Sequence, residues 1–143
     1  MNLSFIGDNV EIKKEHVAKE LDDILSMFMN CYAIDKCYVG NETEFDFAVV
    51  EAVKRAKERQ PDIKCVLVPL SEKTEYDESL YDEVERVSLD ESCIEWATVE
   101  RNEYMITQSK TLVYYFSFSC YLSQAFRAAA VAKKLGKTVF EIY

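Results

Sequence analysis

Residues 3–9 read LSFIGDN, a short apolar run that ends in a Gly-Asp-Asn turn. An apolar run of this length, followed at once by turn-forming residues, predicts a β-strand and a tight turn. Over residues 13–31 the side chains of Val17, Leu21 and Leu25 recur on one helical face, which predicts an amphipathic helix lying on a sheet. A strand, a turn and a helix in this order form the first unit of an α/β fold.

The same alternation continues to the end of the chain. Further strands are predicted at 37–39, 65–68, 111–116 and 138–142, and further helices at about 45–59, 96–108 and 125–135. Pro61 stops the second helix and Gly136 ends the last one. Strands that alternate with crossover helices predict a parallel sheet covered on both faces. We therefore expect one Rossmann-like domain over residues 1–143, an α/β three-layer sandwich with a mainly parallel sheet of five strands.

The segment at about 71–91 interrupts this pattern. It holds nine acidic and two basic residues, and it carries most of the formal net charge of −9. We interpret it as an exposed acidic excursion with one short helical turn. Because the whole chain is acidic and its lysines and arginines are scattered, neither nucleic acid nor an anionic membrane is an expected partner.

The cysteines and the N-terminal residues bear on the cellular compartment. The five cysteines form no CxxC pair, and their odd number favours reduced thiols. The N-terminus has no basic start followed by a long apolar run, and no stretch reaches the roughly 20 apolar residues of a membrane span. These features predict a cytoplasmic protein. One histidine and dispersed cysteines predict no metal site.

Three predicted strands end in turns that are suited to ligand binding. These turns lie at residues 7–9, 40–41 and 117–120, and two of the three glycines of the chain fall in them. In parallel α/β sheets ligands bind beyond the carboxyl ends of the strands, where backbone amides and helix N-termini favour anions. We predict a phosphate or carboxylate site made by Gly7, Gly40 and their neighbours; the alternative is that these are ordinary turns. The chain contains neither GxGxxG nor GxxxxGK[ST], which disfavours dinucleotide dehydrogenases and P-loop enzymes.

Four polar residues in the first two turns and at the start of the second helix are candidate ligand contacts. Asp8 is a candidate general base or metal ligand, and Asn9 lies beside it. Asn41 is a candidate for hydrogen bonding to a ribose or a base, or for a left-handed turn position. Asp46 is a candidate ligand contact or, alternatively, a helix cap.

The remaining candidates lie in the second half of the chain. Arg101 is predicted to grip an anion, or alternatively to pair with Glu100, Glu103 or the acidic excursion. Ser117 and Ser119 are predicted to donate to an anion, or alternatively to cap a helix. Cys120, at a predicted helix start, is a candidate nucleophile with a lowered pKa. The only histidine, His16, is expected at the surface, so no partner base is predicted for this thiol.

Several of these motifs together resemble the SLOG superfamily, which groups Rossmann-like domains related to the DNA-processing protein A and the Lonely Guy phosphoribohydrolases. The YpsA-like branch is the most similar. The resemblance rests on residues 5–7, 38–41 with 45–46, 101–106 and 136–139. It implies a Rossmann-like fold that binds nucleotides or nucleotide-derived ligands at the same strand ends.

The chain differs from that family at the positions that carry the family's binding and catalytic motifs. Asp8 stands in place of a basic residue, Thr43 in place of a glycine, and the turn at 117–120 has no glycine. The PGGxGTxxE signature of the Lonely Guy hydrolases is absent, so nucleotide-sugar cleavage is not implied.

These observations lead to one expected function and two alternatives. We expect a sensory or regulatory domain that binds a small nucleotide-like anion, with no cofactor indicated. The first alternative is a hydrolase or transferase that acts on a nucleotide-derived ligand. The second is a structural or interaction protein that assembles as a homo-oligomer through the aromatic run between Tyr114 and Phe126.

Overall fold

The computed structural model describes residues 1–143 and contains one six-stranded parallel sheet with four α-helices. In chain order the elements are β1 (Leu3–Gly7), α1 (Lys14–Cys31), β2 (Lys36–Val39), α2 (Glu44–Ala56), β3 (Lys64–Leu67), the 3-10 helix η1 (Glu78–Leu80), β4 (Glu83–Val84), α3 (Ile94–Thr107), β5 (Thr111–Tyr115), α4 (Gln124–Lys134) and β6 (Thr138–Ile142). The predicted Rossmann-like α/β sandwich is confirmed. Each helix begins and ends within three residues of its predicted bounds.

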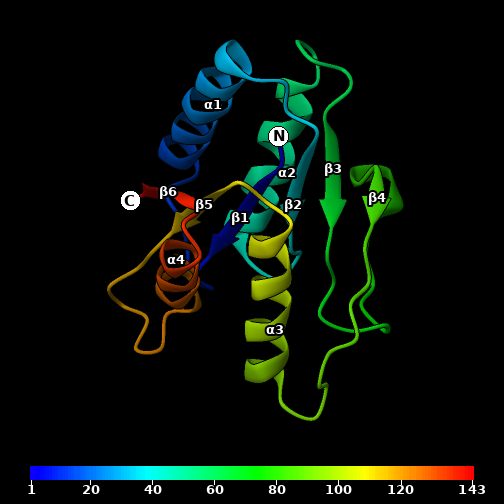
Figure 1. The fold of residues 1–143 in the computed structure, drawn as a ribbon, viewed down its shortest axis with the longest axis vertical. Helices are drawn as coiled ribbons and strands as arrows, with labels where there is room; N and C mark the ends of the chain where they lie inside the picture. The colour runs from blue at the N-terminus through cyan, green and yellow to red at the C-terminus, as the bar shows by residue number, and fades with distance from the viewer.

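Two hydrophobic cores lie on opposite faces of the sheet. The larger core contains buried side chains of α1 and α2, such as Leu21 and Val49. The smaller core contains Met105 of α3 and buried alanines of α4. Successive side chains of a strand point to opposite faces, so in β1 Phe5 joins the larger core and Ile6 the smaller one. The result is three layers, with α1 and α2 on one face of the sheet and α3 and α4 on the other (Figure 1).

The strand order is β4-β3-β2-β1-β5-β6, with β4 and β6 at the two edges (Figure 1). β1 is the strand from which the sheet grows in both directions, because Leu3 pairs with Cys37 of β2 on one side and with Thr111 of β5 on the other. The chain first adds β2, β3 and β4, and then returns to the far side of β1 to form β5. The turns after β1 and β5 therefore flank the topological switch point of the sheet.

The prediction of five strands was wrong by one, because the acidic excursion contains the additional strand β4. Only two residues form it, and Glu83 and Val84 pair with Val66 and Leu67 of β3. A run this short with an acidic residue in it has no apolar alternation from which a strand could be predicted. The predicted helical turn of this segment is present as η1.

Lysines at the edge of the sheet hold this acidic segment in place. The Lys36 amine lies 3.0 Å from carboxylate oxygens of both Glu83 and Glu85. The Lys57 amine lies 2.6 Å from Asp82, whose other oxygen accepts a hydrogen bond from the backbone N–H of Cys65. Much of the negative charge of the excursion is therefore paired with the sheet. None of the four helices is both long enough and apolar enough to cross a membrane.

Gly7 is the position in the sheet at which a side chain fits worst. A Cβ atom there would lie 2.5 Å from the ring of Phe45, which is fully buried and stacked on Tyr115. We expect Gly7→Ala to lower the free energy of unfolding by about 1–3 kcal/mol, the usual cost of overpacking a filled core. Urea denaturation followed by circular dichroism measures this loss.

Gly136 provides the control for that substitution. Its φ is +73°, and nothing lies within 4 Å of the position of its Cβ. Asparagine tolerates this backbone conformation, so Gly136→Asn is expected to cost much less than Gly7→Ala. Equal stability of the Gly7→Ala protein and the wild type would contradict the packing argument.

Candidate functional site

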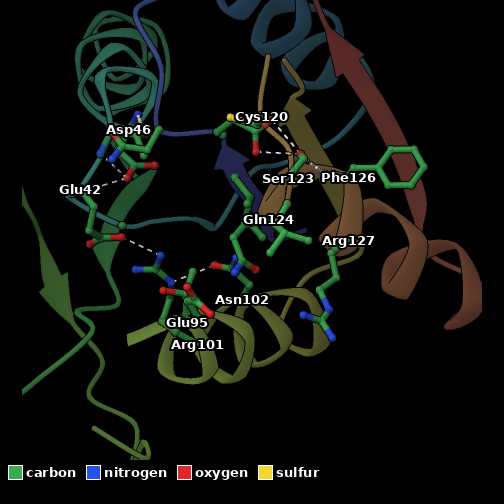
Figure 2. Close-up of a pocket in the computed structure, with 18 of the residues that line it drawn as sticks. Glu42, Asp46, Glu95, Arg101, Asn102, Cys120, Ser123, Gln124, Phe126 and Arg127 are labelled. Carbon is green, nitrogen blue, oxygen red and sulfur yellow. Dashed lines mark hydrogen bonds and ion pairs between the residues drawn. The ribbon is translucent and has the colours of Figure 1, made fainter. Parts of the chain in front are cut away.

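A cleft of about 780 Å³ opens at the carboxyl edge of the sheet. Its walls come from the turns after β1 and β2, from the first half of α3 and from the start of α4. The cleft therefore lies at the switch point between β1 and β5, where parallel α/β sheets bind ligands. Figure 2 shows Glu42 and Asp46 on one wall, Ser123 and Gln124 opposite them, and Arg101 with Asn102 on α3 below. Its volume suits a small molecule of nucleotide size.

Most of the site residues predicted from the sequence line this cleft. The lining includes Gly7, Asp8, Asn9, Gly40, Asp46, Arg101 and Cys120. Three other predicted residues do not line it. Asn41 donates its side-chain amide to the Glu75 carbonyl, whereas Ser117 and Ser119 hydrogen-bond to each other through their hydroxyls. The turn after β5 therefore reaches the cleft through residues 120–123 and not through its serines at 117 and 119.

Asp8 is buried and fully hydrogen-bonded within the chain. Only 2% of the residue is exposed. One carboxylate oxygen accepts from the backbone N–H of Ser117 at 2.8 Å, the other from that of Ala125 at 3.1 Å, and both lie within 2.8 Å of the Ser123 hydroxyl. Ser123 also caps α4 by accepting the N–H of Phe126, so the cap is Ser123 and neither of the two predicted serines. The carboxylate thus ties the turn after β1 to the start of α4.

Arg101 is also buried, and its guanidinium is paired inside the protein. It donates to Asn102 at 2.9 Å, to the carbonyl of Val68 at 3.0 Å and to the Glu42 carboxylate at 2.6 Å. An ion pair was one alternative for Arg101, but its partner is Glu42 and not Glu100, Glu103 or the acidic excursion. A Cβ at Gly40 would lie 2.6 Å from this guanidinium and 2.7 Å from the Glu42 carboxylate. Gly40 therefore makes room for the ion pair.

Asp46 combines a structural role with an open oxygen. It forms a capping box with Thr43, and one of its oxygens, Oδ2, accepts the backbone N–H groups of Glu42 and Thr43. The other oxygen, Oδ1, has no hydrogen-bond partner in the chain, although only 4% of the residue is exposed. No fully buried side-chain oxygen or nitrogen of the protein lacks a partner, so Oδ1 is open to the cleft. Burial, and after it the charge of Glu42, raises the pKa of Asp46 to about 6.

Asn102 offers a complementary group to the same cleft. Its Oδ1 accepts from Arg101, which orients the amide, and only 4% of the residue is exposed. Its Nδ2 has no partner in the chain, and by the same reasoning it is open to the cleft. An open acceptor on Asp46 and an open donor on Asn102 therefore line the same cleft. A polar molecule that both donates and accepts hydrogen bonds would satisfy the two groups.

The mouth of the cleft is rimmed by exposed apolar side chains. We call the following six residues the aromatic rim, and each is more than half exposed: Ile94, Trp96, Phe118, Tyr121, Leu122 and Phe126. Arg127 lies over the ring of Trp96, 5.8 Å from its centroid. Of the five arginines it is the one whose guanidinium has no hydrogen bond or ion pair with the chain.

The structure does not support a reactive thiolate at Cys120. Cys120 lines the cleft, but desolvation and the nearby charge of Asp8 raise the pKa of its thiol. The predicted lowering was wrong because the start of α4 is already occupied by the Asp8 carboxylate. His16 is exposed on α1 and hydrogen-bonds to the backbone oxygen of Tyr143. No three or more His, Cys, Asp or Glu side chains are placed to hold a metal ion.

The polar residues of the cleft that were missed from the sequence include Glu42, Asn102, Ser123 and Arg127. Glu42 follows the Gly-Asn turn after β2, Asn102 follows Arg101, and Arg127 stands in an alanine-rich helix. A charged residue immediately after a predicted strand could have indicated Glu42. Asn102 and Arg127 are candidates because each has polar atoms without a partner in the folded chain. A local sequence pattern cannot reveal this.

Comparison of the chain with known protein families gave no match. No curated protein matched it either. The resemblance to the SLOG superfamily therefore stays a prediction, and the proposals below rest on the geometry of the cleft.

The raised pKa of Asp46 predicts a distinct pH dependence of stability. Between about pH 4, the ordinary pKa of an aspartate, and pH 6 the folded protein holds this proton more tightly than the unfolded chain does. Raising the pH through this window therefore costs the wild type stability relative to Asp46→Asn, which cannot ionise. We expect the stability of the wild type minus that of the variant to fall from pH 4 to pH 6 in urea denaturation. A constant difference would show that Asp46 titrates normally.

Proposed function

We propose that the cleft binds a small nucleotide-derived molecule and that the domain is a ligand-binding module with a sensory or regulatory role. One observation carries this proposal: Asp46 and Asn102 are each more than nine-tenths buried, and each leaves one polar atom without a partner inside the cleft. The buried remainder of each side chain holds this atom in place, and the atom itself is open to the cleft. It can therefore bind a ligand without first breaking a hydrogen bond within the chain.

The polar pair suits a sugar hydroxyl or a base amide. Both of these groups donate and accept hydrogen bonds, as the combination of Asp46 Oδ1 and Asn102 Nδ2 requires. In parallel α/β domains an acidic residue beyond the second strand commonly binds ribose hydroxyls, and Asp46 and Glu42 lie beyond β2. This part of the support is an analogy at the level of the fold.

The rim of the cleft suits the remaining parts of such a ligand. Aromatic side chains stack on flat rings, and Tyr121 and Phe126 stand at the mouth with most of their surface exposed. A guanidinium binds phosphate or carboxylate through two hydrogen bonds, and Arg127 lines the cleft with its guanidinium free. We therefore assign the anionic group of the ligand to Arg127 and not to Arg101, which Glu42 already neutralises.

Two isosteric substitutions test the polar pair. Asp46→Asn turns an open acceptor into a donor, and Asn102→Asp turns an open donor into an acceptor, with little change in shape. We expect each substitution to weaken binding at least tenfold, because the ligand then meets an unpaired polar atom. Titration calorimetry and native mass spectrometry of the wild type against nucleosides, nucleotides and nucleotide sugars identify the ligand and measure this loss.

The same exchanges on the surface are the controls. Asp62→Asn and Asn30→Asp alter exposed residues outside the cleft and are expected to leave affinity unchanged. A folded wild type that binds no member of the panel would contradict the proposal. Conversion of a bound ligand to a new mass, lost in Asp46→Asn, would instead identify the hydrolase or transferase alternative.

The aromatic rim favours a second candidate function, assembly with a second copy of the chain. Two of its side chains pack on the same ring, since Phe116 lies 4.7 Å from Phe118 and 5.4 Å from Phe126 between ring centroids. At about 150–250 Å² for each large aromatic side chain, the rim exposes several hundred Å². This approaches the roughly 800 Å² that each partner contributes to a standard interface.

The charges beside the rim suit a symmetric pair. Glu95 and Arg127 are both exposed, and neither has an ion-pair partner within the chain. In a two-fold dimer, Glu95 of each copy could meet Arg127 of the other. If so, Glu95→Arg or Arg127→Glu alone dissociates the dimer and the double variant restores it, which sedimentation velocity measures. A wild type that stays monomeric at high micromolar concentration would exclude this assembly.

A further inference from the structure

The hydrogen bonds of Asp8 have the donor set of an anion-binding site. Two backbone N–H groups and one hydroxyl converge on its carboxylate, at 2.8 Å from Ser117, 3.1 Å from Ala125 and 2.7 Å from the hydroxyl of Ser123. Ala125 lies in the first turn of α4, where unpaired amides and the helix dipole favour a negative charge. The donors come from two sides, the turn after β5 and the start of α4.

The position of this donor set in the fold matters as much as its chemistry. The start of α4 follows β5 and so lies beside the topological switch point, where open α/β sheets hold the phosphate of a ligand on a helix N-terminus. In this protein the anion at that position is the carboxylate of Asp8. It is 2% exposed and belongs to the chain itself.

A second anion would find no free hydrogen-bond donors at this position, because the Asp8 carboxylate already engages them. Both of its oxygens are engaged, and the Ser123 hydroxyl, besides donating to Asp8, accepts the N–H of Phe126. A phosphate at the same place would meet a buried negative charge and no convergent donors. The guanidinium of Arg127 makes no contact with this donor set and lies over Trp96 of α3.

We propose that Asp8 is a specificity-determining residue of the cleft: its carboxylate occupies the phosphate position at the start of α4, so the wild-type protein takes ligands that present an uncharged group there. This inference rests on the proposed function and narrows its ligand class. A nucleoside, or a nucleotide derivative whose acid group reaches Arg127, fits the cleft. A ligand that places its phosphate on α4 is excluded.

Removing the carboxylate tests this directly, with inorganic phosphate as the probe. In Asp8→Ala the three donors face an empty position of about the size of a carboxylate. We expect Asp8→Ala to unfold at a lower temperature than the wild type and to be restabilised by phosphate in a saturable way, at constant ionic strength. Phosphate should bind Asp8→Ala at least tenfold more tightly than the wild type, measured by titration calorimetry. In the double variant Asp8→Ala, Ser123→Ala, which lacks one donor, the affinity should fall again.

Asp77→Ala is the matched control. Asp77 also accepts an N–H and a hydroxyl at a helix start, both from Ser79, but it is exposed and does not line the cleft. This variant should not gain phosphate binding. If Asp8→Ala does not fold without phosphate, Asp8→Ser serves instead, since its shorter side chain vacates most of the space of the carboxylate, lacks the negative charge and can still hydrogen-bond within the turn.

Each outcome decides the question. A folded Asp8→Ala or Asp8→Ser protein that binds phosphate no better than the wild type overturns the proposal, as does a wild type that binds phosphate as tightly as the variant. The phosphate measurement needs no natural ligand, so it is independent of the proposed function. A wild type that binds no nucleoside or nucleotide, together with a variant that gains phosphate, would reject the function and keep the role of Asp8 in excluding phosphate.

Discussion

The hydrogen bonds of the Asp8 carboxylate hold together parts of the chain that are 109 to 117 residues apart. A charge this deeply buried is tolerated only when hydrogen bonds replace the water that it has lost. The turn after β1, the turn after β5 and the start of α4 are consequently fixed relative to one another. Because all three border the cleft, this one side chain helps to fix the positions of its walls.

The other buried charges around the cleft are neutralised by the chain in a similar way. Arg101 pairs with Glu42 in the space left by Gly40, and Asp46 accepts the backbone amides at the start of α2. These contacts stabilise the walls, and Arg101 is not free for a ligand. The interior leaves open one carboxylate oxygen of Asp46 and the amide nitrogen of Asn102, which favours recognition through directed hydrogen bonds.

Local periodicity carried nearly all of the information about the fold. The helices and the five longer strands are evident because apolar residues repeat at helical or strand spacing, and Pro61 and Gly136 mark helix ends. The location of the cleft followed from the rule for parallel sheets. Which of its side chains are already paired within the chain could not be predicted, because the partners of Arg101 and Asp8 lie far along the chain and become neighbours only after folding. For the same reason, Arg101 was predicted to bind an anionic ligand, whereas in the structure it binds the carboxylate of Glu42. The short strand β4 was not predicted because it lies within an acidic run.

The way the acidic segment ends the sheet has a consequence for the behaviour of the protein in concentrated solution. An open edge strand presents unpaired backbone groups to which a strand of another molecule can add. β4 presents only two residues, and the carboxylates of Glu83 and Glu85 are held beside it by Lys36. For a strand of a second chain, this edge therefore offers few unpaired backbone N–H and C=O groups, and charged side chains surround them. The segment between β3 and α3 accordingly protects one side of the sheet against edge-to-edge aggregation.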